Sequence, residues 1–384
     1  MAREVFAGPN FSGRSAALLA RLRGLGRPAF FVGPYAEAAL SGLSTSVADE
    51  LALYRAPQST RPAFAALATE PLLRRVPQSL SGGEQVLLAL RCFSQAASTA
   101  IGVDTALEQL DGDNRAAALA YLSGGGFDAM LIDNRAEPEG WTVTACAESP
   151  AFAIDWDALA ATVRIPPAQA IAIEALDFAY RHGKTIFANA GAVLTPGAAY
   201  RLFGANGAGK TTLLKLLAGA LRPSRGRLLL DGATCLPWRD GNRAFALATQ
   251  NPDHQWCGAT LREDIARRRR ALGGAAAAAL DDGHVEALAR ALGIASPDQH
   301  LYELPLAARK RLSWLWPLAG AMPWIVFDEP TVGQDRATRG RLAGLLARLC
   351  AAGAGVLFVT HDDAFAAALP HRVLRIENRT ISLL

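Results

Sequence analysis

The sequence contains an internal repeat, and this repeat restricts the possible folds more than any other feature. In each half, a segment that begins with leucine is followed by two aspartates, and the separations are the same in both halves. The first segment spans residues 80–85 and the second spans residues 304–308. A duplication of this kind predicts two related domains of one architecture. The matching positions are Ser81 with Pro305, Asp104 with Asp328, and Asp111 with Asp335.

The boundary between the two halves is marked by a pair of prolines. A chain of 384 residues has room for two or three domains. Pro166 and Pro167 separate a helical pattern at 155–163 from a strand-like alternation at 171–176. We therefore expect two domains, 1–165 and 166–384. Both alternate strand-like and helical segments, which is typical of an α/β fold.

Composition and charge exclude several classes of protein. Hydrophobic residues make up 51% of the chain and charged residues 19%, which favours a globular protein over a disordered one. The net charge of +4 supplies no basic field for nucleic acid. Five cysteines without a C-x-x-C pair suit a reducing cytosol, without disulfides or zinc. We expect no signal peptide, because the N-terminus has no apolar stretch before Gly8, and no membrane span, because the apolar run at 312–327 is short and contains prolines.

A glycine-rich segment in the second half has the spacing of a phosphate-binding loop. The pattern G-x4-G-K-T, from Gly204 to Thr211, follows a strand-like run at 199–203 and precedes a helical pattern at 212–218. Such a loop directs backbone N–H groups and a helix N-terminus toward phosphates, while the lysine neutralises charge and the hydroxyl contacts Mg²⁺. The chain has only four lysines, so a lysine retained here is informative. The predicted nucleotide-binding residues are Gly204, Asn206, Gly207, Gly209, Lys210, Thr211 and Thr212.

A second motif supplies two carboxylates after a buried strand. The apolar run at 323–327 ends in Asp328 and Glu329. We expect Asp328 to hold Mg²⁺, and Glu329 to polarise the water that attacks the nucleotide. Acidic residues at strand ends are common in α/β proteins, so this motif gains its meaning from the phosphate loop.

Together these motifs resemble two fused nucleotide-binding subunits of an ABC ATPase, with tandem P-loop domains that each have an α/β core and a helical subdomain. Residues 80–85, Leu-Ser-Gly-Gly-Glu-Gln, match the signature motif of that family. The resemblance implies ATP and Mg²⁺ as ligands, an adenine-stacking role for Tyr180 and a γ-phosphate contact for His361. A packed core tyrosine and a surface histidine are the alternatives. The other implied ligand residues are Ser81, Gly82, Gly83, Gln85 and Asp111 for nucleotide, Thr211, Gln250 and Asp328 for metal, and Glu329, His361 and Gln250 for catalysis.

The two halves carry complementary defects relative to this family. The second half has the full phosphate loop, but residues 305–308 lack the serine and glycines of a signature. The first half keeps the signature but is truncated, with no strand expected before its loop and no adenine-stacking aromatic. Its replacements are Arg14 for the lysine, Val32 for the glutamine, Thr105 for the glutamate and Asn134 near the histidine.

In this family, one ATP lies between the phosphate loop of one half and the signature of the other. The resemblance therefore implies an intramolecular head-to-tail pairing with one hydrolytic site per chain, the other site being empty or occupied without turnover. That site would combine Lys210 and Glu329 with Ser81, Gly82 and Gly83.

The segment after the second-half glutamine indicates the kind of ABC protein. Residues 250–255 and 260–266 are similar to the motor subunits of energy-coupling-factor and cobalt-type importers. Residues 33–35 and 46–51 of the first half show a weaker form of the same pattern. The resemblance implies a peripheral protein at the cytoplasmic face of the membrane. Its partners would be an integral membrane coupling subunit and a small substrate-binding membrane protein, for uptake of a vitamin or metal ion. The alternatives are the tandem ATPase of a sugar importer, or a soluble ABC protein of translation or DNA repair.

Overall fold

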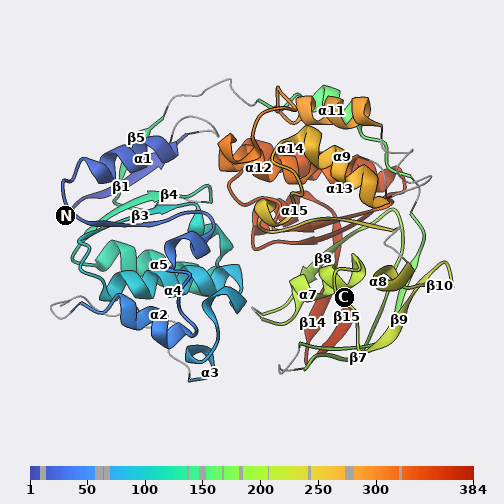
Figure 1. The fold of residues 1–384 in the computed structure, drawn as a ribbon, viewed down its shortest axis with the longest axis horizontal. Helices are drawn as coiled ribbons and strands as arrows, with labels where there is room; N and C mark the ends of the chain where they lie inside the picture. Colours follow the sequence, from blue (N-terminus) through green and yellow to red (C-terminus); the bar gives the residue numbers. More distant parts are fainter. Residues whose placement is uncertain are drawn as a thin grey trace. The chain divides into compact units, whose positions relative to one another are not determined.

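In the computed structural model, the chain forms two compact units (Figure 1). The first consists of Met1–Pro150 with Val332–Arg336, and the second of Ala151–Thr331 with Ala337–Leu384. Helix α6 (Trp156–Thr162) belongs to the second unit, where it packs on α11 (Asp282–Ala291) and the N–H of Asp155 donates to the carbonyl of Ala291 at 2.8 Å. The structure describes residues 1–8, 14–56, 64, 70–135, 138–146, 153–166, 168–180, 185–205, 207–240, 244–272, 281–319 and 322–384.

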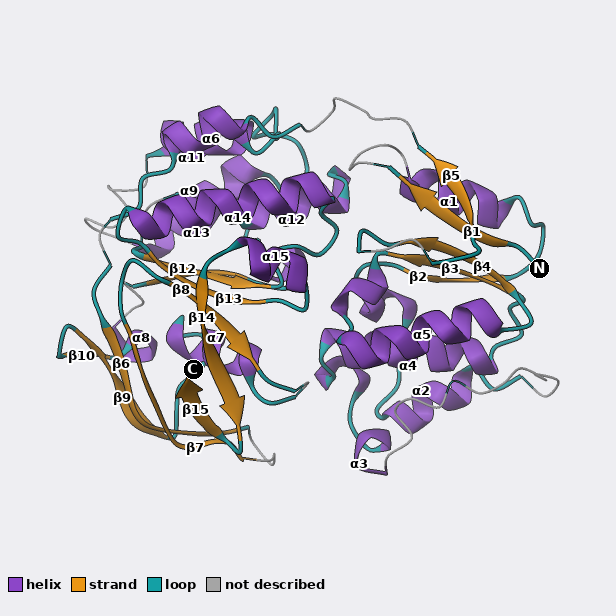
Figure 2. Cartoon of the chain, turned by 180° about the vertical axis from the view of Figure 1, so that it is seen from behind, coloured by secondary structure: helices purple, strands orange, loops and turns teal. Residues whose placement is uncertain are grey.

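The first unit is built on a five-stranded parallel sheet in the order β2-β3-β4-β1-β5. Helix α1 covers one face, and α4 with α5 covers the other (Figure 2). Strands β3 and β4 are buried along their whole length, as expected for a parallel sheet between helical layers. The strands are β1 (Arg3–Ala7), β2 (Ala29–Val32), β3 (Ala100–Asp104), β4 (Asp128–Ile132) and β5 (Thr142–Ala145), and the helices are α1 (Arg14–Arg23), α2 (Val47–Leu53), α3 (Glu70–Leu73), α4 (Gly82–Gln95) and α5 (Gly112–Gly124).

Strand β1 corrects one expectation, because a strand does precede the first-half loop. Its five residues pair with β4 on one side and with β5 on the other. The charged residues Arg3 and Glu4 interrupt the apolar pattern that would predict a strand here. The segment is a strand because it pairs with β4 and β5.

The second unit contains two sheets. A six-stranded sheet runs in the order β11-β12-β13-β8-β14-β15, parallel except for the antiparallel pair β14 and β15. An antiparallel sheet has the order β10-β9-β6-β7. Helix α7 packs between the two sheets through its leucines (Figure 1). The strands are β6 (Ile171–Ala179), β7 (Thr185–Leu194), β8 (Ala199–Phe203), β9 (Arg225–Leu230), β10 (Ala233–Cys235), β11 (Phe245–Ala248), β12 (Trp324–Asp328), β13 (Gly355–Val359), β14 (His371–Glu377) and β15 (Thr380–Leu383).

The remaining helices of the second unit surround these sheets. They are α7 (Lys210–Leu217), α8 (Pro237–Asp240), α9 (Leu261–Leu272), α12 (Leu306–Ser313), α13 (Leu315–Leu318), α14 (Arg336–Ala351) and α15 (Asp363–Ala368). The predicted α/β class is confirmed in each unit. Within the described part of the chain, no helix has the length and apolar character needed to cross a bilayer.

The parallel sheets of the two units have the same strand order. When the strands of each of these sheets are numbered along the chain, the order in the first unit is 2-3-4-1-5. The sheet of the second unit has the same order, with β15 added beyond its fifth strand. The repeat found in the sequence therefore has a counterpart in topology. The matching strands are β1 with β8, β2 with β11, β3 with β12, β4 with β13, and β5 with β14.

Timed labelling with iodoacetamide at about pH 8 is expected to modify Cys257 before Cys92 and Cys350, which need unfolding to react. Cys257 is exposed, whereas burial raises the pKa of Cys92, and burial raises the pKa of Cys350 to about 11. Both buried thiols therefore hold little reactive thiolate. Peptide mass spectrometry measures the three rates, and equal labelling of Cys92 and Cys257 would contradict the packing of the first unit.

Candidate functional site

The phosphate loop of the second unit joins β8 to α7. Gly209 precedes the helix with a φ of 109°, and a Cβ there would lie 2.4 Å from Ile186 Cγ2, so only glycine fits. The Lys210 Nζ donates to the carbonyls of Gly204 and Ala205 at 2.8 and 3.2 Å. The loop thus wraps around its own lysine and leads directly into the N-terminus of α7, the kind of helix end that binds anions. Asn206 lies outside the described residues.

The hydroxyl of Thr211 meets the carboxylate that ends β12. Thr211 Oγ1 donates to Asp328 Oδ2 at 2.8 Å, and Asp328 is buried. Burial raises the pKa of Asp328, and the Thr211 bond opposes that rise. A hydroxyl beside a carboxylate is a donor set that suits Mg²⁺ together with phosphate oxygens. Over the described ranges, no group of three or more His, Cys, Asp or Glu side chains is arranged to hold a metal ion.

Glu329 follows Asp328 in a left-handed backbone conformation, with a φ of 50°. Its N–H donates to the carbonyl of Val359 at 3.0 Å, and its Oε2 accepts from the N–H of His361 at 3.3 Å. Its Oε1 is buried without a hydrogen-bond partner among the described residues, 3.7 Å from His361 Nε2. A carboxylate oxygen held in this way can accept a proton from a water molecule.

Tyr180 lies beside the first turn of α7. The residue is 45% exposed, its ring packs edge-on against Phe178, and its hydroxyl is 3.1 Å from Thr212 Oγ1. The alternative of a packed core tyrosine is therefore wrong. The His361 side chain is 20% exposed and faces Glu329, so it is not a free surface histidine.

Lys310 belongs to this site although its chemistry was not predicted. Its Nζ donates to the carbonyls of Thr249, Gln250 and Asp328 at 3.0, 2.8 and 3.2 Å. Burial lowers the pKa of Lys310 to about 8, while the charges of Asp328 and Glu329 oppose that fall. The scarcity of lysine was the one signal that could have identified it.

The signature residues of the first unit form the start of a capped helix. Ser81 caps α4, since its Oγ accepts from the N–H of Glu84 at 3.4 Å and its own N–H donates to Glu84 Oε2 at 2.7 Å. Gly82 and Gly83 make the first helical turn. Gln85 is buried and its amide donates to the carbonyl of Pro77 at 3.4 Å, inside the unit.

Asp111 has a helix-capping position in the first unit. Its carboxylate accepts from the N–H of Asn114 at 3.0 Å and from the Asn114 amide at 3.0 Å, at the start of α5. At the signature position of the second half, Pro305 precedes α12 without any side-chain cap.

The first unit repeats the backbone of the carboxylate motif with different side chains. Thr105 has a φ of 55° and its N–H donates to the carbonyl of Ile132 at 2.8 Å, as Glu329 does to Val359. Its hydroxyl donates to the carbonyl of Asp104, and threonine has no carboxylate that could act as a base. The first unit thus has the turn without the base.

Arg14 stands where the second unit has its lysine. Its Nη1 donates to Asn134 Oδ1 at 2.6 Å. Burial lowers the pKa of Arg14, and the carboxylates of Asp104, Glu108 and Asp335 oppose that fall. The guanidinium is already engaged by groups of its own unit, to which Asp335 belongs through the segment Val332–Arg336. Most of the loop before Arg14 lies outside the described residues.

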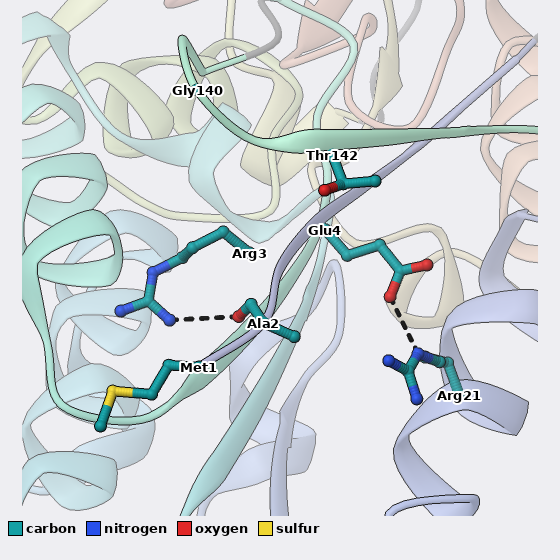
Figure 3. Close-up of a pocket in the computed structure, with 7 residues that line it drawn as sticks. All are labelled: Met1, Ala2, Arg3, Glu4, Arg21, Gly140 and Thr142. Carbon is teal, nitrogen blue, oxygen red and sulfur yellow. Dashed lines mark hydrogen bonds and ion pairs between the residues drawn. The ribbon is translucent and has the colours of Figure 1, made fainter.

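A shallow hollow of 390 Å³ at the start of β1 is separate from these motifs (Figure 3). Its charged groups are already paired, because Glu4 Oε2 accepts from Arg21 at 2.9 Å and Arg3 donates to the carbonyls of Ala2 and Ser123. Nothing in it favours a ligand. Its lining residues are Met1, Ala2, Arg3, Glu4, Arg21, Gly140 and Thr142.

Part of this chain is similar to known proteins. The sequence profile described as "ABC transporter" matches residues 188–332. The cobalt import ATP-binding protein CbiO of Rhodobacter capsulatus is 36% identical over 208 residues, covering 53% of this chain and 74% of that protein. YkoD of Bacillus subtilis, named for HMP/thiamine import, is 29% identical over 205 residues, covering 53% of this chain and 36% of that protein. A solved structure titled as cbiO1 of Clostridium perfringens, part of the ABC transporter complex cbiONQ, has 23% identity and a TM-score of 0.46, covering 56% of this chain and 88% of that chain.

Replacing Lys210 by alanine is expected to weaken binding of a fluorescent ATP analogue by about 10- to 100-fold, the loss of charge-assisted hydrogen bonds worth roughly 1.5–3 kcal/mol. Arg227→Ala is the charge control, since it removes a positive charge from the exposed ion pair that Arg227 on β9 forms with Glu174. Fluorescence titration measures both. An equal loss in the two variants would contradict the assignment of the phosphate loop.

Proposed function

This chain belongs to the ABC transporter ATP-binding proteins, which are ATPases coupled to transport, and we propose that it is the ATP-hydrolysing motor subunit of an importer. The observation that carries the proposal is the bond between Thr211 and Asp328 beside the lysine of a phosphate loop. This pair occurs in a chain that is 36% identical, over 208 residues, to a protein named for cobalt import.

The second unit would bind and hydrolyse the nucleotide. Lys210 and the N-terminus of α7 would hold the phosphates, and Tyr180 would stack on the adenine. Mg²⁺ would neutralise the phosphate oxygens when it is bound. Thr211, Asp328 and Gln250 would hold that ion. Glu329 would take a proton from the attacking water at Oε1, and His361 would orient Glu329 and contact the γ-phosphate.

The first unit would complete this site with its signature. We propose that the chain consists of two related ABC domains that pair head to tail, so that Ser81, Gly82 and Gly83 direct the N-terminus of α4 at the γ-phosphate. Two observations support one hydrolytic site per chain. The second half has Pro305 in place of a capping serine, and the first half has Thr105 in place of a base.

The transporter would be an importer of the energy-coupling-factor type, with this chain as a peripheral subunit at the cytoplasmic face. Similarity to proteins named for cobalt import and for HMP/thiamine import supports a metal ion or a vitamin as cargo. The surface that follows Gln250, with the turn Pro252–His254 and helix α9, would receive the membrane coupling subunit. A small membrane protein would capture the cargo.

Gly82→Asp is expected to lower ATP hydrolysis by at least about 100-fold, although it lies in the unit without a catalytic glutamate. An acidic residue in the first turn of α4 is favourable for the helix, because it complements the helix dipole. Its carboxylate would, however, repel the γ-phosphate. Phosphate release by the purified chain measures the rate.

Gly344→Asp is the matched control for this variant, because it adds the same charge at an exposed position of α14 with open space around it. Arg14→Ala is expected to retain hydrolysis. Turnover that persists in Gly82→Asp but disappears in Lys210→Ala would contradict the head-to-tail pairing. Loss of all hydrolysis in Arg14→Ala would contradict a silent first-unit site.

The tagged chain, purified in detergent from its native cells, is expected to bring down a membrane protein with several spans. Cys257→Arg, at an exposed position after Gln250, is expected to reduce that recovery, because a bulky charge there hinders docking. Val193→Arg, also exposed but on β7, is the control. Recovery of ribosomes or DNA in place of a membrane protein would contradict the importer and favour a soluble ABC protein.

A further inference from the structure

We propose that Lys310 is a positioning residue for the magnesium site of the second unit. Its ammonium group holds the backbone of Gln250 and of Asp328, two of the three residues expected to bind the metal, in one fixed arrangement. The inference deepens the proposed function and rests on it. Lys310 would act through these two residues and would not touch the nucleotide.

The contacts of Lys310 match the requirements of a buried ammonium group. The side chain is completely buried, and its three N–H donors have three carbonyl acceptors at 2.8–3.2 Å. A buried charge is tolerated when its hydrogen bonds are complete. The acceptors belong to two separate places in the chain, the end of β11 and the end of β12, so the lysine connects them.

Neighbouring residues of α12 strengthen the same connection. Arg309 Nη1 donates to both carboxylate oxygens of Asp253 at 2.9 and 2.8 Å. The amide of Gln255 donates to the carbonyl of Ser313 at 3.2 Å. Helix α12 therefore contacts the segment around Gln250 at three points along its length, and Lys310 extends the contact to the end of β12.

The first unit provides an internal comparison. Counted from Ser81, Val86 occupies the place that Lys310 occupies counted from Pro305. Val86 is fully buried and apolar, and it can donate no side-chain hydrogen bond. The lysine is thus present in the half that retains Lys210, Gln250 and Asp328, and valine stands in its place in the half that has lost the lysine and glutamine. This distribution indicates a role in the site rather than in the fold alone.

Affinity for a fluorescent ATP analogue, measured on the full chain with and without Mg²⁺, tests the inference. In Lys310→Met, we expect the affinity without Mg²⁺ to stay within about twofold of wild type, because Lys210 and α7 are untouched. The additional affinity that Mg²⁺ provides should fall by about tenfold, the usual cost of removing a group that orients metal ligands. Lys310→Arg, which keeps charge and donors, should recover part of the loss.

Arg290→Met is the charge control, because it removes an exposed partner of Glu286 on α11 and should change neither affinity. Hydrogen exchange of the nucleotide-free chain gives an independent readout. Amides at residues 249–253 should exchange faster in Lys310→Met than in wild type, and less so in Lys310→Arg. If Lys310→Met does not fold, Lys310→Gln, which retains two donors, is expected to show the same pattern with a smaller loss.

Equal losses with and without Mg²⁺ would overturn the inference, because Lys310 would then support the fold alone. Unchanged Mg²⁺ dependence and unchanged exchange at 249–253 would overturn it as well. These results differ from failure of the proposed function, in which the wild-type chain would bind no ATP and Lys210→Ala would have no effect. That outcome would remove both proposals together.

Discussion

The hydrogen bond between Thr211 and Asp328 is the contact on which the candidate site depends. It joins residues 117 positions apart at 2.8 Å. It forms because β8 and β12 run in the same direction in one sheet, with β13 between them, so that both carry their following loops at the same edge. Ligands of open α/β sheets bind at this edge. This edge therefore brings together the phosphate loop, the carboxylate expected to bind metal, and the candidate base.

The first unit shows what the same topology does with other side chains. Its sheet has the same strand order, and Thr105 repeats the left-handed turn of Glu329 down to the equivalent hydrogen bond. Yet it has Arg14 held by Asn134 where the second unit has a lysine able to meet phosphate. The fold thus provides a place for chemistry, and individual side chains decide whether any chemistry occurs there.

Much of the candidate site was predictable because its motifs are local. A strand, a glycine-rich turn and a helix are consecutive in sequence, so Gly204, Lys210 and Thr211 could be assigned from spacing. Strand β1 was missed, because Arg3 and Glu4 break the apolar pattern and its partners β4 and β5 lie more than a hundred residues away. The sequence likewise left open whether Tyr180 is a core residue, and its exposure beside Thr212 decided the question.

By itself, the sequence determined the internal repeat and the α/β class, and it predicted which residues would bind phosphate and metal. These depend on spacing along the chain and on side-chain chemistry, and both can be read from the sequence alone. Only the tertiary structure decided that Lys310 connects Gln250 to Asp328. The acceptors of Lys310 are backbone carbonyls, which every residue possesses, so no pattern of side chains could predict which carbonyls they are. Only the packing of α12 against the ends of β11 and β12 determines which carbonyls a buried ammonium group reaches.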